Sequence, residues 1–229
     1  TVAELVEIAD GTSGSITLSD TTVALSGSVT DLNTIFSETI TTHTGTVTIS
    51  SAADYDIPKL KVINAGTTGA ITLSDTTVAL SGDATDLAVA LAGTIDHAGA
   101  VTVTTDSDYT LAELKTINNG TDGAITLNDT TVALSGDATD LAAALAGTIT
   151  HEGAVTVTTD SDYTAAELLT IAGATSGAIT LNDTTVALSG SSSDLSTIFT
   201  ETITTHTGAV TITTDSDYTI SHLYTNKYE

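Results

Sequence analysis

The fold is decided by a stretch that the chain repeats, Ile16-Thr-Leu-Ser-Asp-Thr-Thr-Val-Ala-Leu-Ser-Gly27. The same residues return at 71–82, and with Asn in place of the first Ser they return at 125–136 and 179–190. The copies therefore begin at nearly constant intervals along the chain. Self-similarity at a nearly fixed period is typical of repeat proteins, in which each unit buries its apolar face against its neighbours.

A second stretch alternates with the first one and reads Val101-Thr-Val-Thr-Thr-Asp-Ser-Asp-Tyr-Thr110. It is matched at 155–164 and 210–219, and a degenerate copy occupies 47–56. Recurrent glycines cut the chain into alternating longer and shorter pieces; they are Gly14, Gly45, Gly69, Gly99, Gly123, Gly153, Gly177 and Gly208. Each repeat therefore consists of one long and one short half-repeat.

Each half-repeat predicts a strand, a turn and a short helix. Val101-Thr-Val-Thr104 alternates apolar and polar residues, as a half-buried strand does. Thr110 and Glu113 match a capping box, in which both side chains serve backbone amides at the start of a helix. Gly120 is placed to end that helix. In the helices of the long half-repeats, the residues predicted to point into the core are Leu87, Leu141 and Leu195.

This pattern predicts a repeat solenoid, namely a parallel β-solenoid with short helices. Its strand-turn-helix coils form four repeats of about 54 residues, each of two half-repeats. We expect a single domain over 1–229, with a partial half-repeat at 1–13 and repeats at 14–68, 69–122, 123–176 and 177–229. A coil made of one half-repeat is favoured over a wider coil made of a whole repeat. A compact globule with an internal pseudo-repeat is the remaining alternative.

The composition excludes several classes of function. The chain has 229 residues, 4 Lys and Arg against 29 Asp and Glu, and a formal net charge of −25. Four scattered lysines cannot neutralise a nucleic-acid backbone, and an anionic membrane surface repels this charge. The longest apolar stretch, 87–92, is too short to insert into a bilayer. Cysteine is absent, which excludes disulfides and thiol chemistry. Such acidity is typical of extracellular bacterial proteins.

Paired aspartates after the strands of the short half-repeats are candidate calcium ligands; they are Asp106, Asp108, Asp160, Asp162, Asp215 and Asp217. Calcium takes six to eight oxygen ligands, and aligned Asp turns supply several of them. The same residues also fit turn and helix-capping chemistry without any ion. Calcium is thus the one cofactor that the sequence suggests, and it is not required. A second set is predicted to form plain turns: Asp20, Asp75, Asp129 and Asp183.

Three other residue types recur once per repeat. His43, His97, His151 and His206 are predicted to be turn residues, because equivalent copies lie too far apart to share one metal ion. The tyrosines are expected to bury their rings and expose their hydroxyls, with a sugar-binding stack as the alternative; they are Tyr55, Tyr109, Tyr163 and Tyr218. Two threonine columns are expected on two separate faces and raise ice binding as an alternative function; they are Thr17, Thr72, Thr126 and Thr180, and Thr48, Thr102, Thr156 and Thr211.

The helical stretch Thr164-Ala-Ala-Glu-Leu-Leu-Thr-Ile171, which follows a Val-Thr-Val-Thr strand, resembles a known kind of repeat. Similar runs occur in the Thr/Asp/Ala-rich tandem repeats of very large surface and secreted proteins of cyanobacteria and marine proteobacteria. The resemblance covers nearly the whole chain and implies an extracellular adhesive, matrix or surface-layer role. The glycine-rich nonapeptide that binds calcium in RTX proteins is absent, so their metal site does not carry over.

We therefore expect a non-catalytic, extracellular structural or adhesive repeat module on the bacterial cell surface. Catalysis is disfavoured because a catalytic site needs one special environment, whereas the polar residues here recur in every repeat. The alternative is a repeat-based module that binds Ca²⁺ or ice. Residues 1–9 match a short-half helix and 210–214 match its strand, which predicts either head-to-tail self-association or a piece of a longer chain. A cell-surface or matrix partner is expected, and nothing in the sequence identifies it.

Overall fold

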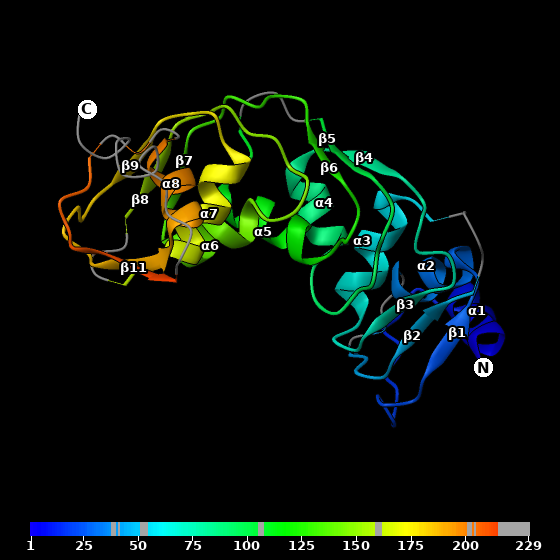
Figure 1. Cartoon of the computed structure of the whole chain (residues 1–229). Coiled ribbons are helices and arrows are strands. Elements are labelled where there is room, and N and C mark those ends of the chain that lie inside the picture. Colours follow the sequence, from blue (N-terminus) through cyan, green and yellow to red (C-terminus); the bar gives the residue numbers. More distant parts are fainter. Residues whose placement is uncertain are drawn as a thin grey trace. The chain divides into compact units, whose positions relative to one another are not determined.

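The computed structural model describes residues 1–37, 40, 42–50, 55–104, 108–158, 162–200, 203 and 205–214. Over these residues short helices alternate with short strands (Figure 1). The helices are α1 (Val2–Gly11), α2 (Val29–Ser37), α3 (Ile57–Gly66), α4 (Ala84–Ala90), α5 (Leu111–Asn119), α6 (Ala138–Ala144), α7 (Ala165–Ala174) and α8 (Ser192–Thr200). Successive helices begin at nearly equal intervals, so each half-repeat carries one helix.

The strands form small parallel sheets. The sheets contain β1 (Leu25–Gly27), β2 (Val47–Ile49) and β3 (Ile71–Leu73); β4 (Leu80–Gly82), β5 (Val101–Val103) and β6 (Ile125–Leu127); β7 (Leu134–Gly136), β8 (Val155–Val157) and β9 (Ile179–Leu181); and β10 (Leu188–Ser191) and β11 (Val210–Thr214). Equivalent residues are paired, as in the row Leu25, Val47 and Ile71. Short parallel strands alternating with helices are compatible with a repeat fold.

The long half-repeat differs from the expected strand-turn-helix order because it contains two strands. Residues 71–82 hold both β3 and β4, and these two strands belong to different sheets. The turn between them is built on Asp75, whose Oδ1 accepts hydrogen bonds from the backbone amide and the hydroxyl of Thr77 at 2.9 and 2.7 Å. The extra residues of the long half-repeat therefore carry the chain from one sheet to the next.

The helix starts follow the capping chemistry that the sequence predicts. Thr164 accepts a hydrogen bond from the Glu167 amide, and the Glu167 carboxylate accepts one from the Thr164 amide. The same box is present at Thr1, and the hydrogen bonds between Thr110 and Glu113 follow the same pattern. Pro58 lies in the first turn of α3, where the missing amide proton leaves no helical hydrogen bond unmade.

The core consists of aliphatic side chains between the strands and the helices. Each interior strand buries its first and third residues, as Val47 and Ile49 do at 0% exposure. The predicted inward-facing leucines are confirmed, because they are 0–2% exposed; they are Leu87, Leu141 and Leu195. With so few aromatic residues available, burial of branched aliphatic side chains supplies the main apolar stabilisation.

The chain divides into two compact units. One comprises residues 1–105 and 116–126, and the other comprises 106–115 and 127–229. In the first unit, α1, α2, α3 and α4 pack in sequence order, and in the second α6, α7 and α8 do the same. The expected single domain with boundaries at 14, 69, 123 and 177 stays a prediction. Among the described residues, no helix combines the length and the apolar character needed to cross a bilayer.

Candidate functional site

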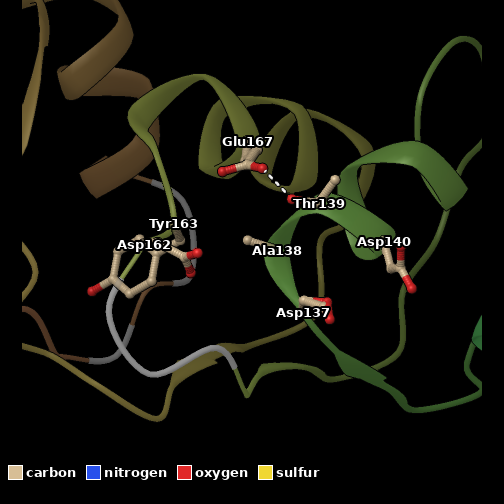
Figure 2. Close-up of a pocket in the computed structure, with 7 residues that line it drawn as sticks. All are labelled: Asp137, Ala138, Thr139, Asp140, Asp162, Tyr163 and Glu167. Atoms are coloured by element: carbon tan, nitrogen blue, oxygen red, sulfur yellow. Dashed lines mark hydrogen bonds between the residues drawn. The ribbon is translucent and has the colours of Figure 1, made fainter.

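The predicted calcium ligands are only partly within the described residues. Asp108 and Asp162 are described and are exposed, whereas Asp106, Asp160, Asp215 and Asp217 lie outside the described part of the chain. Asp162 lines a pocket of about 180 Å³ in the second unit (Figure 2). Its other lining residues are Asp137, Ala138, Thr139, Asp140, Tyr163 and Glu167.

This pocket lies where α6 and α7 begin. Glu167 joins the two helices, because its Oε1 accepts a hydrogen bond from the Thr139 hydroxyl at 2.7 Å and its Oε2 accepts from the Thr164 amide at 2.8 Å. Partial burial favours the neutral acid, but these hydrogen bonds outweigh it and hold the pKa of Glu167 below 4.5. Glu167 is therefore a carboxylate at neutral pH, and it is held in place by both helices.

The aspartate at the start of α6 differs from its counterpart one repeat earlier. Asp83 caps α4 by accepting a hydrogen bond from the Asp86 amide at 2.8 Å, whereas the Asp137 side chain makes no such bond to α6. The pocket thus gathers the carboxylates of Asp137, Asp140, Asp162 and Glu167. Figure 2 shows them spread around the pocket, and among the described residues no group of three His, Cys, Asp or Glu side chains is arranged to hold a metal ion.

The recurring histidines are buried connectors between distant segments. His43, His97 and His151 are at most 1% exposed. Nε2 of each lies 2.7–2.9 Å from a valine carbonyl 19 or 20 residues earlier, those of Val23, Val78 and Val132. Nδ1 of each lies 2.9–3.1 Å from a threonine hydroxyl 24 residues later, those of Thr67, Thr121 and Thr175. Both ring nitrogens are occupied, so these three histidines offer no nitrogen to a metal ion.

The expectation that these histidines are simple turn residues is therefore incomplete. Their side chains fasten one half-repeat to the segments before and after it. Burial lowers the pKa of the His97 and His151 imidazoles below 6.5. The hydrogen bonds to the valine carbonyls and the charges of nearby carboxylates favour the protonated form, but their effect is smaller than that of burial. These two histidines are neutral at pH 7. The sequence did carry a signal for their partners, because Thr67, Thr121 and Thr175 also recur once per repeat.

The tyrosine prediction is wrong in one respect. The rings of Tyr55, Tyr109 and Tyr163 are buried as expected, at 2–3% exposure, but their hydroxyls are not free. Each donates to a backbone carbonyl 20 residues later at 2.6–2.9 Å, those of Asp75, Asp129 and Asp183. Burial raises the pKa of Tyr55 and of Tyr109 to about 12. Buried rings cannot stack on a sugar; Tyr218 lies outside the described residues.

The threonine columns do not occupy two separate faces. Thr48 pairs with Thr72, and Thr156 pairs with Thr180, so members of both predicted columns lie side by side within one sheet. The serines of the first strands, among them Ser26 and Ser135, continue the same row. Each of these sheets therefore presents a ladder of hydroxyl groups, Ser-Thr-Thr, on its outer side.

The second set of aspartates forms turns, as predicted. Asp20, Asp75, Asp129 and Asp183 each accept two hydrogen bonds through Oδ1, from the amide and the hydroxyl of the threonine two residues later. These bonds lower the pKa of all four carboxyls below 3.8. Their chemistry is therefore that of stable turns.

A scan against protein-family models and a search among curated proteins find no match to this chain. Function must therefore be inferred from the residues and their geometry.

Proposed function

We propose that this chain is a non-catalytic structural or adhesive repeat module of the bacterial cell surface or extracellular matrix, built as a parallel β-solenoid of four two-part repeats. The observation that carries the proposal is that the same buried polar side chains recur, with the same hydrogen bonds, from one repeat to the next. Three histidines and three tyrosines make equivalent hydrogen bonds in successive repeats. A catalytic site is local and breaks such symmetry, whereas a scaffold repeats it.

The regular spacing of elements supports the solenoid. Helices begin at nearly equal intervals along the chain, and neighbouring helices in each unit pack against each other. Parallel strands pair equivalent residues, such as Leu134, Val155 and Ile179. An array of this kind uses only contacts between neighbouring units, and it can gain or lose a unit without losing its core.

The extracellular location is supported by the composition and by the resemblance to bacterial surface repeats. A net charge of −25 keeps a protein soluble and repels nucleic acid, and the helical stretch 164–171 is similar to runs in large surface proteins. A repeat array whose described polar groups recur from repeat to repeat suits a spacer, a stalk or a matrix component.

Deleting one whole repeat tests the architecture. Removing residues 69–122 joins two segments in phase, so the shortened chain should fold and melt cooperatively with an unchanged circular dichroism signal per residue. Removing only the long half-repeat 69–98 is the matched control, because it puts β5 rather than a counterpart of β3 after α3 and so joins two short half-repeats out of phase. Loss of folded structure in both deletions to the same extent would show that the chain is a single globule rather than an array.

Antibody labelling tests the location and role. Antibodies raised against this chain should label intact cells of the source organism or their matrix, and brief protease treatment of intact cells should remove the label. Labelling only after the cells are permeabilised would contradict the proposal.

A second candidate function, a cation-binding module, rests on the aspartates that the sequence suggests as calcium ligands, of which Asp162 lines the α6–α7 pocket. Calcium bound there would stabilise the folded chain by mass action. Millimolar Ca²⁺ should then raise the melting temperature of the natural chain more than Mg²⁺ does, and the variant Asp137→Asn/Asp162→Asn should abolish the difference. An unchanged melting temperature rejects this function.

The hydroxyl ladders leave ice binding as a further alternative, which an ice-recrystallisation assay decides.

A further inference from the structure

We infer that each buried histidine–threonine link is a proton-responsive device built into the fold. In mild acid the imidazole takes up a proton, and the threonine hydroxyl turns from the imidazole to a glycine carbonyl while the fold stays intact. The described links join His43 to Thr67, His97 to Thr121 and His151 to Thr175. The link between His97 and Thr121 shows how the device works.

The carbonyl of Val78 fixes where His97 carries its proton at neutral pH. Nε2 of His97 lies 2.8 Å from this oxygen, and a carbonyl oxygen can only accept a hydrogen bond. Nε2 therefore carries a proton. Because burial lowers the pKa of His97 below 6.5, the ring is neutral at pH 7, and its Nδ1 carries no proton.

The Thr121 hydroxyl is then a donor toward His97. Its oxygen lies 2.9 Å from Nδ1, and a nitrogen without a proton can only accept. The same oxygen accepts a hydrogen bond from the Gly123 amide at 3.0 Å. A hydroxyl has a single proton, so in the neutral state this proton points to His97. The Gly99 carbonyl, 3.3 Å from the hydroxyl oxygen, is a second acceptor within its reach.

Protonation of His97 reverses the direction of the hydrogen bond to Thr121. Since Nε2 already carries a proton, the added proton goes to Nδ1, and the imidazolium donates through both nitrogens. The Thr121 oxygen then accepts from Nδ1 and from the Gly123 amide, which uses both of its lone pairs, and its own proton turns to the Gly99 carbonyl. Each of these groups has a partner in both states, so protonation leaves none of them buried and unsatisfied.

A pocket of about 250 Å³ in the first unit borders this link. His97 and Thr121 line it together with Asp96, Asn119 and Asp122, among other residues. The side chains of Asp96 and Asp122 are exposed, so the pocket connects the link with solvent and gives protons a route to it. The negative charge of Asp96 also favours the imidazolium form of His97.

Two further titratable groups belong to this region and keep their charge state in mild acid. The Tyr55 ring contacts the His97 ring edge-on, with 6.4 Å between the ring centroids, and burial raises the pKa of its hydroxyl to about 12. Asp75, whose charge acts on Tyr55, is held ionised because hydrogen bonds from Thr77 lower its pKa below 3.8. His97 is therefore the buried group of this region that changes its charge in mild acid.

The other described links have the same pair of acceptors for their hydroxyls. The Thr67 oxygen lies 3.4 Å from the Gly45 carbonyl oxygen, and the Thr175 oxygen lies 3.2 Å from that of Gly153. Each link therefore has the same two states. Acid makes the folded chain less stable, but it does not detach one half-repeat from the next, because the hydrogen bonds of each link are exchanged rather than lost.

Nuclear magnetic resonance of the full chain with isotope-labelled histidine tests the inference. The His97→Gln variant identifies the resonances of His97 by their loss, and circular dichroism follows the fold in the same samples. At neutral pH the His97 ring should carry a proton on Nε2 and none on Nδ1. On acidification it should gain the second proton while the circular dichroism spectrum stays native. A neutral ring with its proton on Nδ1, or a second proton that is gained only as the fold is lost, would overturn the inference.

Two variants of Thr121 separate the proton-responsive role from a merely structural one. Thr121→Val removes the acceptor of the imidazolium, and hydrogen bonds to charged groups are the stronger ones, so the titration midpoint of His97 should shift to lower pH. Thr121→Ser keeps the hydroxyl and should titrate like the natural chain. An unmoved midpoint in Thr121→Val, or a midpoint in Thr121→Ser as low as that of Thr121→Val, would contradict the device. If Thr121→Val does not fold, the natural chain and Thr121→Ser decide the outcome.

Discussion

The Thr67 hydroxyl lies 2.9 Å from Nδ1 of His43, although 24 residues separate the two in the chain. The same oxygen accepts a hydrogen bond from the Gly69 amide at 3.0 Å, so a single buried hydroxyl joins two half-repeats and fixes the glycine turn between them. Identical arrangements connect His97 to Thr121 and His151 to Thr175. Replacing the threonine or the histidine of such a link should therefore lower the stability of the fold.

Removing one of these hydroxyls should destabilise the fold. In Thr121→Val the His97 ring nitrogen and the Gly123 amide lose a buried partner, so the free energy of unfolding should fall by about 1–3 kcal/mol. Thr121→Ser keeps the hydroxyl and should cost clearly less. Urea denaturation measures both variants, and equal losses would mean that the methyl group rather than the hydrogen bonds matters at this position.

Mild acid should also weaken the fold. The folded chain holds the pKa of His97 and of His151 below the ordinary value of 6.5. The unfolded chain therefore binds more protons just below pH 6.5, and the free energy of unfolding declines as the pH falls from 6.5 toward the folded pKa. The Asp129 carboxyl, with its pKa below 3.8, adds its own loss only in stronger acid.

Urea titrations between about pH 7.5 and about pH 5 measure this dependence. The double variant His97→Gln/His151→Gln removes these two imidazoles, so its stability should be lower at neutral pH and should change less with pH in this range. A pH dependence as steep as that of the natural chain would assign the effect to other groups.

Two glycines in the second unit should respond to alanine in opposite ways. A Cβ on Gly177 would lie 1.9 Å from the Gly153 carbonyl oxygen, so Gly177→Ala should force the two backbone segments apart and strongly destabilise the chain. Gly173 in α7 has nothing within 4 Å of its added Cβ, so Gly173→Ala should stabilise the chain by about 0.5–1 kcal/mol through helix propensity. Thermal melts compare them, and a loss of similar size in both would contradict the close approach at Gly177.

The packed face of the long-half helices can be tested at Leu141. This side chain is 0% exposed, and Leu141→Ala should lower the free energy of unfolding by about 2–5 kcal/mol. Val89→Ala, at a side chain that is 41% exposed, should change it by less than about 0.5 kcal/mol. If Leu141→Ala has an effect near zero, the helix packs through another face.

The features that the sequence predicted correctly depend on short spacings. The capping box at Thr110 and Glu113 is read within a single helical turn, and the inward direction of Leu141 follows from helical periodicity. The sequence does not predict the second strand of the long half-repeat, because only the turn at Asp75 separates it from the first strand. The two strands are recognised as separate elements once they are seen to belong to different sheets.

Features that join distant segments could not be derived in the same way. The partners of His97 lie 19 residues before and 24 residues after it, and the acceptor of the Tyr55 hydroxyl is a backbone carbonyl that no residue type marks. The α6–α7 pocket likewise is lined by both Asp137 and Asp162, a relationship between two helix starts that the turn motif alone does not contain.

The side-chain links between distant segments span similar stretches of chain. The histidine bonds close loops of 19–24 residues, the tyrosine bonds close loops of 20, and the ion pair of Lys61 with Asp86 closes a loop of 25. Closing such short loops has a small entropic cost, so ordering can begin at any half-repeat and spread along the chain. A polypeptide with these links can acquire its native contacts progressively as it leaves the ribosome or a secretion channel, without waiting for its final residues.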